Sequence, residues 1–302
     1  MLVSGASGLI GSALVASLER AGAAVARLVR HEARGAGEIS WDPARGRLDP
    51  AALEGADAVV HLSGESLAAH RWNDSVRARI RESRVGSTRL LAETLARLQR
   101  PPAIMVSASA GGIYGDRGDP PLTEESPAGS DFLATLARDW EAATAPAEAR
   151  GIRVVHLRSG LVLSPRGGAL ARLLPIFRLG LGGPLGDGRA WVSWITLDDH
   201  VAVIRRAIEE PRLAGPVNAS TPGPVTHETL ARTLGRVLRR PAFLRVPRIA
   251  LKIALGAFAD EGLLASQRMV PARLMAVGHR FAFPSLEPAL RHVLAGGSDG
   301  GG

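Results

Sequence analysis

Short apolar runs alternate with longer stretches of helical spacing along the first half of the chain. The apolar runs predict strands at 1–4, 23–29, 56–62, 103–109 and 151–158. Helical spacing predicts helices at 9–21, 72–100 and 131–149. Because strands that alternate with helices form parallel sheets covered on both faces, this pattern predicts an α/β fold. We expect a Rossmann-type, doubly wound parallel sheet.

The pattern changes after residue 163. Residues 164–188 are rich in Gly and Pro around an apolar helix, and 211–295 are mostly helical in spacing. We therefore predict a Rossmann domain at 1–163, to which 189–210 returns, and a smaller, mostly helical C-terminal lobe on the substrate side, formed by 164–188 and 211–295. The Gly-rich residues 296–302 are predicted to be a disordered tail.

A glycine turn joins the first predicted strand to the first predicted helix. Glycines stand at positions 5, 8 and 11. In such a turn, Gly5 permits the sharp bend, Gly8 lets a pyrophosphate approach the helix N-terminus, and Gly11 lets helix and strand pack closely. A Gly-rich turn without a ligand is the alternative. The flanking strand and helix favour dinucleotide binding.

The end of the second predicted strand carries an arginine where an NAD-binding unit carries a carboxylate. The strand ends at Arg30, and the first carboxylate after it belongs to Glu32. An acidic residue at this point holds the ribose 2′-hydroxyl of NAD, whereas an arginine accepts the 2′-phosphate of NADP. We therefore expect NADP rather than NAD. The alternative is that Arg30 is a solvated loop charge.

Composition narrows the class of protein. The chain has no Cys, which excludes disulfides, thiolate metal sites and Cys nucleophiles and suits a cytoplasmic protein. No apolar run reaches the roughly 20 residues of a membrane span, so we expect no membrane partner. The net charge is +8, but the arginines are spread along the chain, so no nucleic-acid partner is expected. No metal site is predicted.

Two features suggest where a substrate would lie. Ser107 and Ser109 end the predicted strand at 103–109, and hydroxyls at the carboxyl end of a parallel strand are well placed to meet a substrate. Near the expected cleft, arginines and two tryptophans suggest a sugar-like or anionic small molecule, although ordinary packing of the lobe is the favoured explanation. These residues are Arg166, Arg172, Arg178, Arg189, Trp191 and Trp194.

Several longer segments of the sequence, spread over nearly the whole chain, resemble those of one known protein family. Among them are GASGLIG, SASAGGIYGDRGD, DFLATLARDWEAA and LASQRMVPARLMAVGHRF. Together they resemble the extended short-chain dehydrogenase/reductase superfamily, and in detail its epimerase-family branch with a C-terminal domain of unknown function. The resemblance implies that the cofactor is contacted by Gly5, Ser7, Gly8, Leu9, Ile10, Gly11, Arg30, Leu62, Ser63, Gly64 and Ser107.

One departure from the superfamily concerns catalysis. The resemblance implies a Tyr acid/base and a Lys on the helix after the serine strand, but Leu133 and Ala137 stand at these positions. The main candidates left for catalysis are Ser109 and Tyr114, the only Tyr in the chain. Further titratable candidates near the pocket are Glu65, His70, Asp116, Glu124 and His156. We expect an NADP-binding oxidoreductase or epimerase with an atypical active site, or alternatively a non-catalytic NADP-binding sensor or scaffold. Superfamily members often dimerise, so a homodimer is one expected assembly.

Overall fold

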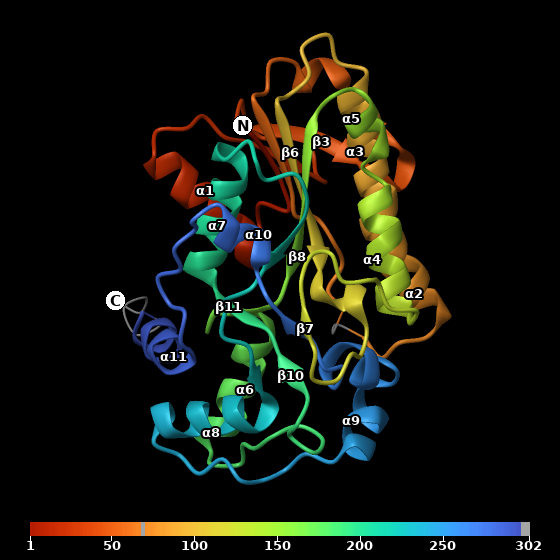
Figure 1. Ribbon diagram of the computed structural model, residues 1–302. Helices are drawn as coiled ribbons and strands as arrows, with labels where there is room; N and C mark the ends of the chain where they lie inside the picture. Colours follow the sequence, from red (N-terminus) through yellow and green to blue (C-terminus); the bar gives the residue numbers. More distant parts are fainter. Residues whose placement is uncertain (68–69, 297–302) are drawn as a thin grey trace.

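A twisted parallel sheet forms the centre of the computed structural model, which describes residues 1–67 and 70–296 (Figure 1). Within these residues the sheet has eight strands in the order β12-β8-β6-β5-β1-β2-β3-β4. β4 alone runs antiparallel to its neighbour, β3. The predicted Rossmann-type fold is confirmed. The strands are β1 (Leu2–Ser4), β2 (Ala26–Val29), β3 (Glu38–Asp42), β4 (Arg47–Leu48), β5 (Ala58–His61), β6 (Ile104–Ala110), β8 (Arg153–Ser159) and β12 (Gly215–Ala219).

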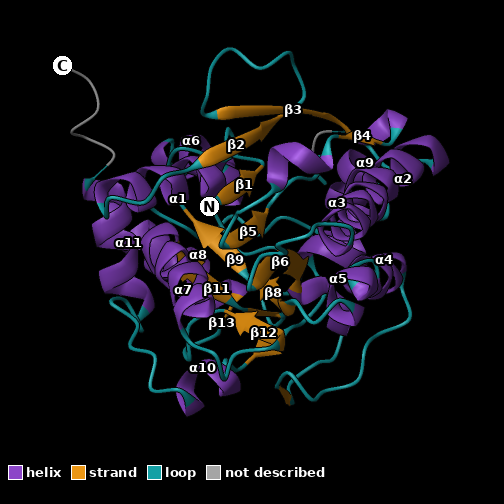
Figure 2. Cartoon of the chain, turned by 90° about the horizontal axis from the view of Figure 1, so that it is seen from above, coloured by secondary structure: helices purple, strands orange, loops and turns teal. Residues whose placement is uncertain are grey.

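Helices cover both faces of the sheet (Figure 2). Successive strand residues point to opposite faces. Val3 and Val60 accordingly pack with α1 and α7, whereas Leu2 and Val59 pack with α3 and α5. The strands are thus buried on both sides, which explains their almost continuous apolar sequence. The covering helices are α1 (Leu9–Arg20), α2 (Asp74–Arg81), α3 (Ser87–Ala96), α4 (Phe132–Ala142), α5 (Ala145–Ala149) and α7 (Leu197–Glu209).

Two of the predicted long helices are interrupted. The predicted helix at 72–100 is divided into α2 and α3 by a π turn at Glu82–Gly86. There the hydroxyls of Ser83 and Ser87 donate to backbone carbonyls. These hydroxyls compete with the backbone N–H groups that would otherwise bond to the same carbonyls in a regular α-helix. The predicted helix at 131–149 is divided at Thr144, whose hydroxyl contacts His156 of β8 at 2.9 Å. Both interruptions point polar side chains into the protein.

The lobe is built around Trp194 from three helices that are far apart in sequence. α6, α8 and α11 surround this fully buried indole. Three small two-stranded sheets accompany the main sheet in the described residues: β9 with β11, β10 with β13, and β7 with β14. The elements are β7 (Pro121–Leu122), β9 (Leu161–Leu163), α6 (Gly168–Arg178), β10 (Trp191–Val192), β11 (Trp194–Thr196), β13 (Val225–Thr226), α8 (His227–Leu238), α9 (Arg248–Leu255), β14 (Arg268–Met269), α10 (Ala272–Ala276) and α11 (Leu286–Ala295).

The boundary of the lobe differs from the sequence-based prediction in one respect. The sequence predicts that residues 211–295 belong to the lobe, but β12 pairs in parallel with β8 and extends the main sheet. Leu274 of α10 packs into the core of the same sheet. In the described residues, no helix is long and apolar enough to cross a membrane, and no His, Asp and Glu side chains cluster as metal ligands do. Apart from Gly296, the predicted tail lies outside the described residues.

Candidate functional site

The glycine turn lies between β1 and α1, where the order of strands in the sheet reverses. Gly5 has a φ of +67°, and a Cβ there would lie 2.7 Å from the carbonyl carbon of Leu62. A Cβ on Gly11 would lie 2.2 Å from the carbonyl oxygen of Gly5. Because both contacts involve backbone atoms, glycine is required at these positions for the turn to close against β5.

The other side of this turn is open. Ser7 and Gly8 are exposed, and no described side chain caps α1 or places an acid in its first turn. The N–H groups of Leu9, Ile10 and Gly11 therefore have no intrahelical acceptor. A helix N-terminus in this condition attracts phosphate through its N–H groups and its dipole. The predicted cofactor residues 5–11 thus form a cradle that fits a pyrophosphate.

Arg30 follows β2 directly and is exposed. Within the described residues its guanidinium has no ion-pair or hydrogen-bond partner. The nearby carboxylate of Glu38 accepts a hydrogen bond from the Arg34 backbone N–H at 2.9 Å and lies 4.0 Å from His31. The charge of Arg30 is therefore available to an anion at the edge of the crevice where an adenosine ribose binds in this fold.

The exit of β5 forms the next wall of the crevice. Leu62 donates its N–H to the Ser4 carbonyl at 3.2 Å, and Gly64 is exposed. Behind them Arg84 donates to the Glu65 carbonyl at 2.9 Å and stacks 5.2 Å from the ring centre of Trp140. Burial lowers the pKa of Arg84 to about 10, so it stays charged at neutral pH. We did not predict this arginine, which lies in the π turn after α2.

Ser63 remains half-buried at this exit, but Ser107 is placed differently. The Ser107 side chain is fully buried, and the residue pairs in register with His61 and His156. His61 contacts the Ser4 hydroxyl at 2.6 Å, and burial lowers its pKa to about 4. The side chains of Ser4, His61, Ser107 and His156 thus form a row of polar groups across neighbouring strands in the interior of the protein. The burial of Ser107 argues against the predicted side-chain contact with a cofactor.

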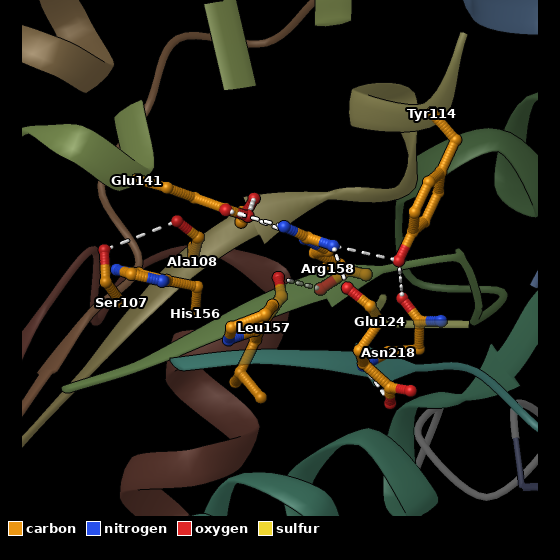
Figure 3. Close-up of polar contacts among 12 residues, drawn as sticks. Ser107, Ala108, Tyr114, Glu124, Glu141, His156, Leu157, Arg158 and Asn218 are labelled. Carbon is orange, nitrogen blue, oxygen red and sulfur yellow. Dashed lines mark hydrogen bonds and ion pairs between the residues drawn. The ribbon is translucent and has the colours of Figure 1, made fainter. Parts of the chain in front are cut away.

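A polar network around Arg158 and Glu141 lies at the carboxyl ends of β6 and β8 (Figure 3). Arg158 donates from Nε and Nη2 to the two carboxylate oxygens of Glu141, each at 2.9 Å. The Ser109 hydroxyl donates to the same carboxylate at 2.7 Å. The bidentate pair connects β8 to α4 and holds the Ser109 hydroxyl in the network.

Tyr114 closes the other end of this network and is fully buried. Its hydroxyl donates to Asn218 Oδ1 at 2.6 Å and accepts from Arg158 Nη1 at 3.1 Å. Burial raises the pKa of Tyr114, against the smaller opposing effect of the Arg158 charge. The phenol is thus neutral and already has two partners. This position argues against the predicted catalytic role of Tyr114, because a proton donor must reach the substrate.

Leu133 and Ala137 face the protein interior from α4. Both side chains are buried, and Ala137 packs with Ile113 and Tyr114. Neither side chain can transfer a proton. Of the tryptophans expected near a substrate, Trp194 lies in the lobe core with its indole N–H on the Gly223 carbonyl at 2.8 Å. It is therefore unavailable for stacking on a ligand, whereas Trp191 is partly exposed.

The sequence pattern of the NAD dependent epimerase/dehydratase family matches residues 1–219, which include the glycine turn and the polar network. The chain belongs to this family. Residues 246–293 match a second pattern, a domain of unknown function named DUF1731. The resemblance predicted from the sequence is thereby confirmed for both parts.

Several known proteins are similar over nearly the whole of this chain. An epimerase family protein of Mycobacterium bovis is 44% identical over 291 residues, with 96% of each chain covered. The crystal structure of the human epimerase family protein SDR39U1 with NADPH is 33% identical, with a TM-score of 0.88 and coverage of 97% of this chain and 98% of that one. A nucleoside-diphosphate sugar epimerase of Corynebacterium glutamicum is 41% identical, with a TM-score of 0.80, and the match covers 97% of this chain and 57% of that one.

The fold brings the predicted residues together in two groups. Around the β1–β5 crevice lie the glycine turn, Arg30 and the exit of β5 from Leu62 to Gly64. Ser109 and Tyr114 form the second group, which is buried around Arg158 and Glu141. The first group is open to a ligand, and the second has its hydrogen-bonding capacity occupied by the protein. The first group can therefore bind a ligand, whereas the second serves to hold the protein together.

Proposed function

We propose that this family member binds NADP(H) in the crevice between β1 and β5. The observation that carries the proposal is the uncapped N-terminus of α1 next to the exposed, unpaired guanidinium of Arg30. The N–H groups of residues 9–11 would hold the pyrophosphate, and Arg30 would hold the 2′-phosphate. NADPH bound to the similar human protein supports this assignment. When bound, the cofactor supplies hydride chemistry.

Two functions are compatible with such a site. In the first, the chain is an epimerase-like or oxidoreductase-like enzyme for an unidentified small molecule, and its proton transfers do not use a Tyr–Lys pair. In the second, it is a non-catalytic sensor or scaffold that responds to NADP(H). The buried, apolar Leu133 and Ala137 and the occupied hydroxyl of Tyr114 favour the second. A screen that follows both NADPH oxidation by carbonyl compounds and epimer formation from sugars in the presence of NADP+ distinguishes them, because either kind of turnover supports the first function.

The Arg30→Ala variant tests the cofactor assignment. Loss of a charge-assisted contact to the 2′-phosphate should weaken NADPH binding by roughly tenfold to a hundredfold, which corresponds to about 1.5–3 kcal/mol. NADH has no such phosphate, so its weaker binding should not change. Isothermal titration calorimetry measures both. The matched control is Arg150→Ala, an exposed arginine beyond α5. Equal affinity of the wild-type protein for NADPH and NADH, or no affinity for either, would overturn the assignment.

Tyr114→Phe tests the role of the buried network. The variant loses the hydrogen bond to Asn218, so we expect the free energy of unfolding in urea to fall by about 1–2 kcal/mol. NADPH affinity should stay within twofold of wild type, and so should any activity found in the screen. Ser109→Ala provides the matched comparison from the other end of the network. A folded Tyr114→Phe protein that binds NADPH but has lost turnover would restore the catalytic interpretation.

A further inference from the structure

Contrary to the expectation that the arginines are spread along the chain, one stretch of the lobe carries basic residues and no acidic one. Residues 229–259 contain no acidic residue, although the net charge of the whole chain is only +8. A run of one charge sign is usually a surface that meets a partner of the opposite sign. The basic residues of this stretch are Arg232, Arg236, Arg239, Arg240, Arg245, Arg248 and Lys252.

The same stretch exposes large apolar side chains. None of residues 239–255 is buried, and among the α9 residues only Leu255 packs against a core cluster. Phe243, Ile249 and Ile253 are 74%, 73% and 71% exposed. Ile249 and Ile253 are four residues apart and therefore lie on one side of α9. Single exposed apolar residues are normal, but several large ones within one short stretch of chain are typical of an interaction surface.

Residues after α6 extend this group. Leu244 donates its N–H to the Gly182 carbonyl at 3.1 Å, which places the segment from Leu179 to Leu181 beside it. Leu179 is 74% exposed. Figure 1 shows the connection from α8 to α9 running along the end of the lobe away from the sheet. The lobe-end surface, as we call it, consists of Leu179, Leu181, Phe243, Leu244, Ile249 and Ile253 with Arg239, Arg240, Arg245, Arg248 and Lys252.

Local acids neutralise only part of this charge. Glu228 lies 3.3 Å from Arg245, and Asp260 lies 2.7 and 2.8 Å from Arg248 and Lys252. Arg239 and Arg240 are exposed and have no ion-pair partner in the described part of the chain. These five cations thus have ion pairs with two carboxylates, and Asp116 is a third carboxylate that acts on Arg248. The lobe-end surface is positive as well as apolar.

We propose that the lobe-end surface docks on an anionic lipid bilayer. A helix that lies in a membrane interface combines an exposed apolar side with Lys and Arg, which attract anionic headgroups. A second copy of the same surface would place like charges opposite one another. Single-stranded nucleic acid needs aromatic side chains for base stacking, and this surface offers only Phe243. The proposal replaces the expectation of no membrane partner, which rested on the lack of a spanning segment.

Vesicle flotation with the full chain tests the proposal. Vesicles of phosphatidylcholine alone are compared with vesicles in which about a third of the lipid is phosphatidylglycerol. We expect binding to the second kind only, and weaker binding at high salt because the headgroup attraction is screened. Ile249→Ser/Ile253→Ser and, separately, Arg239→Gln/Arg240→Gln should each reduce binding by roughly tenfold or more.

Matched controls remove similar side chains elsewhere. Met275→Ser removes an exposed apolar group, and Arg150→Gln removes an exposed charge. Both should bind vesicles like the wild-type protein. The proposal is overturned by a lack of binding to phosphatidylglycerol vesicles, or by undiminished binding of both double variants. It is also overturned if sedimentation velocity shows self-association that Ile249→Ser/Ile253→Ser abolishes while vesicles remain unbound.

Discussion

Gly8 and Gly11 lie one helical turn apart, yet a methyl group should act differently at each. On Gly11 it would meet the Gly5 carbonyl oxygen at 2.2 Å, so Gly11→Ala should lower the free energy of unfolding by about 1–3 kcal/mol. On Gly8 the only close atom is the same oxygen at 3.2 Å, and the φ of −74° suits any residue. Gly8→Ala should therefore fold almost normally.

Gly8→Ala, which should change stability little, should weaken NADPH binding strongly. The Gly8 methyl would occupy the open side of the turn, toward which the free N–H groups of α1 point, so we expect affinity to fall by roughly tenfold or more. Urea denaturation and calorimetry on both proteins provide the comparison. A Gly8→Ala protein with wild-type NADPH affinity would contradict a pyrophosphate at this turn.

The elements that could be predicted are those whose signal is local. α1 follows directly from its apolar spacing, and β5 from its apolar run. β12 was missed because Gly215–Ala219 contains Pro216 and Asn218, which weaken the strand pattern. Its place in the sheet comes from pairing with β8 and from packing of Val217, which sequence alone does not show.

The two halves of the candidate site also differ in whether their signal is local in the sequence. The glycine turn and Arg30 belong to one continuous strand–helix–strand unit, so their spacing indicates a nucleotide. The partners of Tyr114, by contrast, are 44 and 104 residues away in Arg158 and Asn218. A tyrosine at a strand exit is consistent with catalysis until those partners are known. Their geometry assigns it to an internal network.

At the scale of the whole molecule, the lobe depends on long-range packing. α6, α8 and α11 come from three separate parts of the chain and meet around Trp194. Segments between them return to the sheet, as β12 and α10 do. The lobe and the sheet therefore share many connections, and we expect them to unfold together rather than as independent domains.

Buried histidines should make the stability of this whole unit depend on pH. His61 lies in β5 and His200 in α7, and burial lowers the pKa of each to about 4. Unfolded histidine titrates near pH 6.5. Between these values the unfolded chain binds protons that the folded chain does not, so the free energy of unfolding should fall as pH falls from about 6.5 to 4. Each histidine contributes up to about 3 kcal/mol to this fall in the free energy of unfolding, since one pKa unit is about 1.4 kcal/mol.

Urea denaturation between about pH 7.5 and 4.5 measures how steeply the free energy of unfolding depends on pH. His200→Gln should make this slope shallower, because it removes one of the two buried imidazoles. An unchanged slope in His200→Gln would mean that this imidazole is already protonated in the folded protein.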